Sequence, residues 1–248
     1  MSSTVETGHA KVVANFEKLI AVVSAFGASY NPTRDSIQLA ALNAQLTAAK
    51  AAVAAVNAAD PAYRNACNAR EVAFEPLSKL ITRVSSALKA SGVPPQAHEN
   101  ALTFVRKLQG RRASRKLTED ELKAMEAQGE TVTQASASQM SFDNRLDNLD
   151  KLIQLLASLS AYAPNEEELK VSSLTALYTQ LQAVNTAAVT AEIPLRSTRI
   201  ARNDLLYKAD TGVVDTSTDV KTYVKSVFGP SSPQYKSVSG IKFTHRRM

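Results

Sequence analysis

The chain contains two copies of one pattern, and this internal duplication restricts its possible folds more than any other feature. Residues 15–20 read NFEKLI, and residues 148–153, 133 positions later, read NLDKLI. Further blocks match in the same order at spacings of 132, 140 and 130, and the spacing changes within segments rich in Gly, Pro, Asp and Ser. Ordered matches of this kind indicate a duplication, so we expect the two halves to share a fold. Because stacked arrays generally need three or more repeats, two copies favour a pseudo-twofold pair.

The composition favours closely packed helices over sheets. Aromatic residues make up 6% of the 248 residues, Trp is absent and Gly occurs only 8 times, whereas Ala and Leu recur throughout. Ala and Leu have high helix propensity, and a chain of this length can bury a substantial core. We therefore predict an all-α protein: an elongated helical bundle of two tandem pseudo-symmetric repeats with long, Pro-kinked helices.

A seam with alternating spacings of three and four residues runs through the first half. Its members are Leu39, Leu42, Leu46, Ala49, Val53, Val56, Asp60, Tyr63, Cys67, Arg70, Phe74, Leu77, Ile81, Val84 and Leu88. This spacing is typical of a helix that packs along one stripe, and its phase is kept across Pro61 and Pro76. Asp60-Pro61 could begin a new helix, or one long helix could bend there, and the retained phase favours the long helix. The second half has the same pattern on both sides of Pro194.

Helix and turn signals divide the chain into three regions. A first helix is predicted over residues 10–28, and the halves should close with shorter segments at 95–109 and 231–243. Between them, the sequence TEDE at 118–121 is a capping box for a short helix, and residues 131–138 have the composition of a flexible linker.

The predicted domains are therefore a first helical repeat (1–110), a charged and flexible linker with a short helix (111–140), and a second helical repeat with a basic C-terminal tail (141–248).

Several features predict a cytoplasmic protein with no membrane contact. The first seven residues lack a basic region followed by an apolar stretch, and the apolar stretch from Leu19 to Ala28 is too short to span a bilayer. The single cysteine, Cys67, excludes an internal disulfide. Cys67 is best interpreted as a small residue on an apolar helix face, because no His lies near it in sequence to activate a nucleophile.

Positive charge is the strongest candidate for a binding function. The net charge is +6 and the pI is near 9.4, and the excess of basic residues gathers at the end of each repeat. The candidate polyanion contacts are Arg106, Lys107, Arg111, Arg112, Arg115, Lys116, Lys236, Lys242, Arg246 and Arg247. Such residues could neutralise the phosphates of a nucleic acid without reading its bases. The alternative is a solubilising tail and a connector whose charge neighbouring Glu and Asp residues balance, and the absence of interleaved aromatic residues favours this alternative.

Arg70 and Arg202 occupy equivalent seam positions. A buried Arg needs an oxygen partner, so each could clamp an anion or could fix the register of two helices, and we favour the structural role. Likewise, Glu17 and Lys18, repeated as Asp150 and Lys151, are most simply surface or inter-helix ion pairs.

No group of residues predicts catalysis, cofactor binding or metal binding. The three histidines, His9, His98 and His245, lack metal-ligand spacing, and no Glu-x-x-His pair marks a di-iron bundle. Glycine-rich phosphate loops and nucleophile-elbow serines are also missing from the sequence. We therefore expect a protein that is not an enzyme and uses no cofactor.

Four blocks resemble a family of uncharacterised bacterial all-helical proteins with an internal duplication. These blocks are residues 15–20, Tyr30-Asn31-Pro32, residues 68–74 (NAREVAF) and residues 225–229 (KSVFG). The resemblance covers most of the chain and implies a bacterial, cytoplasmic origin, but it implies no activity.

The duplication, the long seam and the missing chemistry together predict a non-enzymatic structural or scaffolding protein. Its partner would be itself, in an oligomer or filament formed through helix faces. The alternative is sequence-nonspecific polyanion binding, with nucleic acid as the partner.

Overall fold

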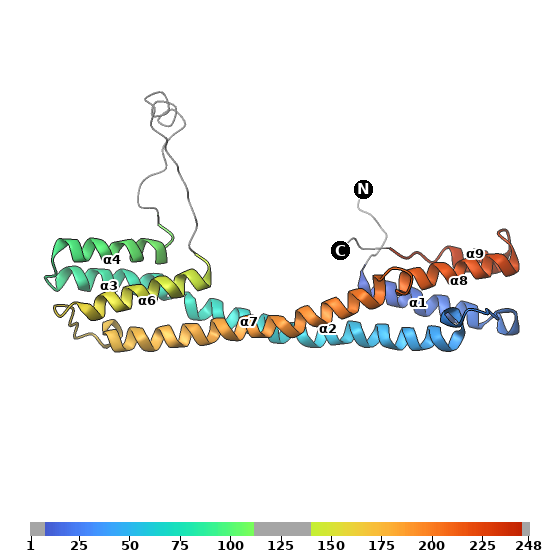
Figure 1. Cartoon of the computed structure of the whole chain (residues 1–248), viewed down its shortest axis with the longest axis horizontal. Helices are drawn as coiled ribbons and strands as arrows, with labels where there is room; N and C mark the ends of the chain where they lie inside the picture. The colour runs from blue at the N-terminus through green and yellow to red at the C-terminus, as the bar shows by residue number, and fades with distance from the viewer. Residues whose placement is uncertain (1–7, 112–139, 245–248) are drawn as a thin grey trace, which may run out of the picture. The chain divides into compact units, whose positions relative to one another are not determined.

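The computed structural model describes residues 8–111 and 140–244, which form helices and turns with no strand among them (Figure 1). The α-helices are α1 (His9–Ser24), α2 (Leu39–Phe74), α3 (Leu77–Ala90), α4 (Pro95–Leu108), α6 (Phe142–Ser158), α7 (Val171–Tyr207), α8 (Val213–Phe228) and α9 (Pro233–Ser239). Three short 3₁₀ helices are η1 (Gly27–Ser29), η2 (Asp35–Ile37) and η3 (Glu167–Leu169). The prediction of an all-α protein is confirmed. The capping box at 118–121 and the linker at 131–138 lie outside the described residues.

The chain divides into two compact units, each built from parts of both halves. Unit 1 combines Met1–Arg64 with Ala191–Met248, and unit 2 is Asn65–Thr190. Both boundaries fall inside long helices, α2 and α7. The units therefore follow tertiary packing, whereas the ranges predicted from the sequence follow the repeat.

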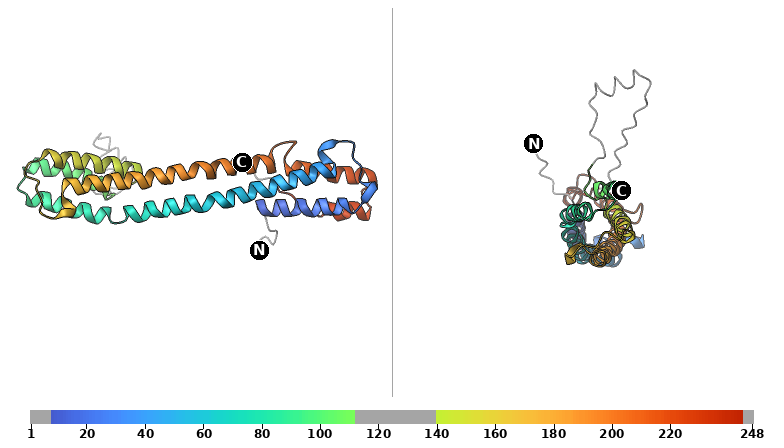
Figure 2. Two further views of the ribbon diagram at one scale, coloured as in Figure 1. Left: turned by 90° about the horizontal axis from the view of Figure 1, so that it is seen from below. Right: turned by 90° about the vertical axis from the view of Figure 1, so that its left-hand side faces the viewer.

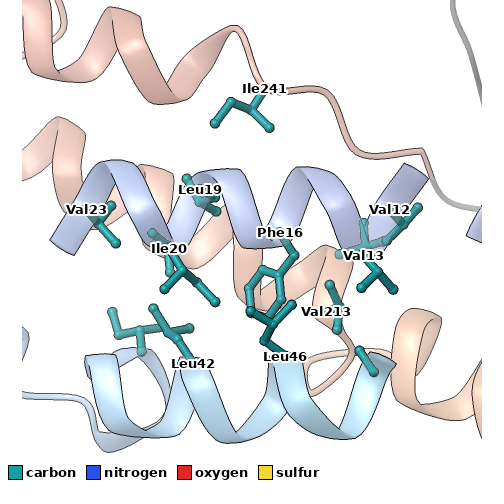
Figure 3. Close-up of a cluster of buried hydrophobic side chains, with 14 of the residues drawn as sticks. Val12, Val13, Phe16, Leu19, Ile20, Val23, Leu42, Leu46, Val213 and Ile241 are labelled. Atoms are coloured by element: carbon teal, nitrogen blue, oxygen red, sulfur yellow. The ribbon is translucent and has the colours of Figure 1, made fainter. Parts of the chain in front are cut away.

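The core of unit 1 forms around α1. Val13, Phe16, Ile20 and Val23 lie three or four residues apart and are buried, so they form one apolar stripe along this helix. Figure 3 shows these side chains directed toward Leu42 and Leu46 of α2, with Val213 of α8 nearby. The helix ends before Gly27, whose φ of +55° suits glycine, and this explains why it is shorter than the predicted 10–28.

The core of unit 2 forms among α3, α4, α6 and parts of α2 and α7. Figures 1 and 2 show α3, α4 and α6 side by side. The buried side chains are Phe74, Leu77, Ile81, Val84, Leu88, Ala101, Val105, Leu108, Leu146, Leu149, Leu152, Ile153, Leu156, Tyr162, Leu169, Leu174 and Leu181. Leu77, Ile81, Val84 and Leu88 form the predicted seam along α3, and all four are at most 1% exposed.

The prolines of the seam have different effects. Pro61 and Pro194 lie inside α2 and α7, so the favoured interpretation, one helix through each proline, is correct. At Pro76 the helix stops: α2 ends at Phe74 and α3 begins at Leu77. Pro76 has no N–H to donate to the carbonyl of Val72, four residues earlier, so the helical pattern is interrupted there. Next to this break, the carbonyl of Phe74 accepts a hydrogen bond from Arg145 Nη2 at 2.9 Å.

The elements follow the same order in the two halves. Apart from η1, which has no counterpart among the described residues of the second half, the first half presents α1, η2, α2, α3 and α4, and the second presents α6, η3, α7, α8 and α9. The hydroxyl of Tyr30 donates to the carbonyl of Ile37 at 2.7 Å, and that of Tyr162 donates to the carbonyl of Leu169 at 2.8 Å. A duplication would produce this correspondence. The duplication and the elongation themselves stay predictions.

Candidate functional site

The basic residues proposed for polyanion contact belong to two different units. Arg106 and Lys107 are half-buried in the last turn of α4, and Arg111 is exposed just beyond it, in unit 2. Lys236 and Lys242 are exposed in unit 1. Five further candidates, Arg112, Arg115, Lys116, Arg246 and Arg247, lie outside the described residues. The five described candidates are thus divided between the two units, and the polyanion site stays a prediction.

Two other basic residues of unit 1 are partly covered by aromatic rings. Lys221 Nζ donates to the carbonyl of Ile241 and lies 5.0 Å from the centre of the Phe243 ring. Burial lowers the pKa of Lys221. Lys225 Nζ lies 6.0 Å from the centre of the Tyr235 ring. These contacts attach α8 to the segment that follows it, so they are structural contacts.

Residues 8–111 and 140–244 contain no group of three or more His, Cys, Asp or Glu side chains placed to hold a metal ion. His9 Nδ1 forms a hydrogen bond of 2.9 Å with the hydroxyl of Tyr207. Cys67 is a half-buried free thiol, and Arg70 Nη2 lies 4.0 Å from its sulfur. Among the described residues, no His is bonded to Cys67, and its interpretation as a packing residue stays a prediction.

Arg70 joins α2 to α7 in unit 2. Its Nη1 donates to Asn185 Oδ1 at 3.1 Å, and Asn185 Nδ2 donates to Asp143 Oδ1 at 2.7 Å. Asn185 is only 7% exposed, and its side-chain oxygen and nitrogen both have hydrogen-bond partners, which compensates for its burial. The guanidinium of Arg70 lies 4.1 Å from the centre of the Phe142 ring. These contacts support the structural role, in which Arg70 fixes helix register.

Arg145 extends these contacts into a cluster of Arg70, Phe74, Phe142 and Arg145. It lies 5.0 Å from the centre of the Phe74 ring, and Phe74 meets Phe142 edge to face at 4.9 Å. Burial lowers the pKa of Arg145. The Nε atoms of Arg70 and Arg145 are buried without a hydrogen-bond partner among the described residues. Arg70 bonds to Asn185 within α7, and Arg145 bonds to the carbonyl at the end of α2, so these contacts are suited to holding α2, α6 and α7 together.

An open depression of about 640 Å³ lies between α3 and the loop before η3 in unit 2. Its lining residues are Thr82, Arg83, Ser86, Ala87, Ala90, Ser91, Tyr162, Ala163, Pro164, Asn165, Glu166 and Leu169. Arg83 Nη1 forms an ion pair with Glu168 beside it. Sequence patterns alone did not indicate this depression, because it depends on contacts between residues about 80 positions apart.

Unit 1 also exposes apolar side chains along its long helices. Ile193 and Ile200 of α7 are 64% and 54% exposed. They lie one heptad apart, so they lie on the same face of the helix, and we call them the isoleucine pair. On α2, exposed alanines recur every three or four residues and form the alanine stripe: Ala44, Ala48, Ala51, Ala55, Ala58 and Ala62.

Among the described residues, the helical stretch Leu39–Ala90 is long and apolar enough to cross a membrane by length and composition, and 22% of its apolar window is buried. This stretch is a different segment from Leu19–Ala28, whose short length is the basis for predicting no membrane span. Core helices of soluble proteins meet the same criteria when they are mostly buried, whereas most of this window is exposed, and a single such helix is weak evidence for a membrane span. The absence of membrane contact and the cytoplasmic location stay predictions.

No protein-family model, curated protein or solved structure matches this chain. The resemblance to bacterial helical proteins therefore stays a prediction as well.

Proposed function

We propose that this protein is a non-enzymatic structural or scaffolding protein that associates with itself through exposed helix faces of unit 1. The isoleucine pair carries the proposal: two large apolar side chains more than half exposed at equivalent heptad positions of α7. A single exposed apolar residue needs no explanation, but two that repeat with the period of a coiled coil form the seam that a second helix would cover.

The alanine stripe supports the same proposal. Its six members lie within an arc of about 80° on α2, at about 100° per residue. Side chains as small as a methyl group allow a second helix to approach closely over a length of five turns. Polar residues such as Asn43, Thr47 and Lys50 alternate with the stripe on the neighbouring faces, which suits contact with another helix in water.

The energies predict weak, concentration-dependent association. Covering four half-exposed isoleucines, two from each copy, would contribute about 4–6 kcal/mol. Association costs about 4–15 kcal/mol in lost translational and rotational freedom. The isoleucine pair alone therefore gives little surplus, and stable oligomers would need the alanine stripe or repeated contacts in a filament.

The test compares the protein with the variant Ile193→Lys/Ile200→Lys. Light-scattering mass should rise with concentration for nuclease-treated wild-type protein, and negative-stain electron microscopy should show defined oligomers or polymers. The double variant should stay monomeric, because it places two like charges on each copy of the contact. Gln180→Lys, at an exposed polar position of α7, is the matched control and should assemble like the wild type. A wild-type protein that is monomeric at every concentration would contradict the proposal.

The second candidate, sequence-nonspecific polyanion binding, is supported by the exposure of Arg111, Lys236 and Lys242. Binding of a duplex DNA probe should weaken steeply with salt. The slope of the logarithm of the binding constant against the logarithm of the salt concentration should be about −1 for each phosphate contact. Lys236→Gln/Lys242→Gln should reduce that slope by about two if these lysines contact phosphates. Absence of binding at low salt would exclude this candidate.

A further inference from the structure

The loops after α1 and α6 share one internal hydrogen bond, from a buried tyrosine to a backbone carbonyl seven residues later. In unit 1, Tyr30 is 5% exposed and its hydroxyl reaches the carbonyl of Ile37 at the end of η2. In unit 2, Tyr162 is 6% exposed and its hydroxyl reaches the carbonyl of Leu169 at the end of η3. The loop of unit 1 packs beside α8 and that of unit 2 beside α3, and Tyr162 lines the depression there.

In unit 1 a second tyrosine covers that face. The rings of Tyr223 and Tyr30 meet edge to face with centres 5.3 Å apart at an angle of 88°. The Tyr223 hydroxyl accepts a hydrogen bond of 3.2 Å from the backbone N–H of Asn31. Arg34 and Asp219 form an ion pair of 2.7 Å that also links this loop to α8. The loop of unit 1 is thus closed against its helix by an aromatic side chain.

In unit 2 the matching position of α3 holds Arg83, not a tyrosine. The register follows from the next residue of each helix, because Val84 and Val224 are both fully buried. The guanidinium of Arg83 pairs with Glu168, and its side chain is 55% exposed. The small side chains of Ser86, Ala87 and Ala90 leave the depression open beside Tyr162.

We propose that this depression binds the tyrosine side chain of another protein, in the position that Tyr223 occupies in unit 1. Its volume of about 640 Å³ lies within the range of about 300–1,000 Å³ that is typical of ligand sites. The incoming ring meets Tyr162 by its edge, and Arg83 supplies a cation beside its face.

The walls of the depression favour a phenol over a plain benzene ring. The hydroxyls of Thr82, Ser86 and Ser91 each donate to a carbonyl of α3, at 3.1, 3.0 and 2.8 Å. The Thr82 hydroxyl already accepts a hydrogen bond of 2.8 Å from Gln109 Nε2. The lone pairs of Ser86 and Ser91 can accept a hydrogen bond, and a phenol hydroxyl has the proton to donate. The N–H of Ala163 already donates to the carbonyl of Ala161 at 3.1 Å, so the phenol here acts as a donor, unlike Tyr223.

The occupant comes from another protein because this chain has no aromatic side chain to offer. All 7 tyrosines and 7 phenylalanines lie in the described residues, and each is buried or half-buried. Because none of these rings is classed as exposed, a second folded copy of the chain presents no protruding ring to the depression. This proposal is independent of the self-association proposed above, which involves other residues.

The test is a titration of the ¹⁵N-labelled full chain with N-acetyl-tyrosinamide, followed by NMR. Amide signals of Ala87, Ala163 and Asn165 should shift saturably, and N-acetyl-phenylalaninamide should bind several-fold more weakly. Arg83→Tyr fills the depression with the chain's own ring and should weaken binding at least tenfold. Lys79→Tyr places a tyrosine on α3 outside the depression and should change the affinity less than twofold.

Three outcomes would overturn the proposal: no saturable shifts, shifts confined to other regions, or unchanged binding in Arg83→Tyr. Ala87→Leu provides a second variant that fills the floor of the depression with a good helix former. Ala87→Leu should also weaken binding at least tenfold. It replaces Arg83→Tyr as the test if circular dichroism shows that Arg83→Tyr has lost the helical content of the wild type. Unchanged binding in folded Ala87→Leu would equally contradict the proposal.

Discussion

In unit 2, Arg70 and Asn185 join α2 to α7 by side-chain hydrogen bonds, whereas the matching positions of unit 1 hold Arg202 and Val53. Arg202 bonds to its neighbour Asn203 at 2.8 Å, and Val53 packs at the edge of the apolar core. Arg145 and Phe142 of α6 correspond to Val12 and His9 of α1. In unit 1 an ion pair of 3.4 Å between Arg199 and Asp60 links α7 to α2 instead. The comparison shows that corresponding helices can be joined by a partly buried Arg–Asn–Asp network in one unit and by a more exposed ion pair in the other.

The largest difference between the junctions should come from Phe74, which is 1% exposed and contacts both Phe142 and Arg145. Phe74→Ala should lower the free energy of unfolding of unit 2 by about 3–5 kcal/mol through the cavity and the lost ring contacts. The matching Leu206→Ala should cost unit 1 about 2–4 kcal/mol, because Leu206 is a smaller side chain without a ring and its removal leaves a smaller cavity.

Native-state hydrogen exchange measures both effects, since it reports the amides of each unit separately. Val72→Ala is the control, because Val72 is 68% exposed two residues from Phe74 and should change stability by less than about 0.5 kcal/mol. A smaller loss for Phe74→Ala than for Leu206→Ala would mean that the aromatic cluster does not strengthen the junction of unit 2.

A double-mutant cycle tests whether the polar junction is the determinant of register. Asn185→Val copies the residue of unit 1 and should cost about 1–3 kcal/mol, because Arg70 and Asp143 lose their shared partner. Arg70→Leu added to Asn185→Val should recover part of that loss, since replacing both partners by apolar groups removes the uncompensated charge. Urea unfolding of the wild type, the two single variants Asn185→Val and Arg70→Leu, and the double variant gives the coupling energy. Additive effects of the single substitutions would show that the two residues act independently.

Much of this fold could be predicted from spacing alone. The seam residues from Leu42 to Leu88 are buried or half-buried throughout, because a three-four spacing necessarily lines one side of a helix. Arg70 was recognised as a register-fixing residue because a charge at a seam position needs an oxygen partner. These conclusions depend on local geometry, which the sequence contains.

Features set by distant contacts could not be predicted. The seam continues in phase past Pro76, so nothing in the sequence shows that Arg145, 71 residues beyond Phe74, takes the carbonyl at the end of α2. Which parts of the halves pack into one unit depends on long-range contacts in the same way. The substitution of Tyr223 by Arg83 in the repeat is visible in the sequence, but only the structure shows that a depression results.

The paired loop tyrosines allow a comparison by pH. Burial, and to a lesser extent the charge of Glu166, raises the pKa of Tyr162 to about 12. Burial likewise raises the pKa of Tyr30, with a smaller contribution from Tyr223. The unfolded phenol has a pKa of about 10, so the folded state holds the proton more tightly. This contribution to stability is complete below about pH 10 and is lost as the pH rises through about 12.

Tyr162→Phe should therefore cost about 1 kcal/mol at pH 7, from the lost hydrogen bond to Leu169, and should reduce the loss of stability of unit 2 between about pH 10 and 12. Thermal unfolding across this pH range checks the effect, and Tyr178→Phe, at a half-buried position of α7, is the control. A variant with the same alkaline sensitivity as the wild type would show that another group causes it.

The smallest effect is expected for the ion pair between Glu17 of α1 and Lys50 of α2, at 2.6 Å. Both side chains are about half exposed, so Glu17→Gln should cost no more than about 0.5 kcal/mol, and the difference should vanish in 1 M salt.

In unit 2 the matching residues are Asp150 and Gln182, and Asp150 instead accepts a hydrogen bond from Gln154. The buried apolar residues of α6 nevertheless follow the same pattern as those of α1, with Leu149, Leu152 and Ile153 matching Phe16, Leu19 and Ile20. Since the packing recurs without the ion pair, apolar burial determines how these helices pack. Urea unfolding of Glu17→Gln beside Lys18→Gln tests this, and a loss above about 1.5 kcal/mol for Glu17→Gln alone would require a specific role for the pair.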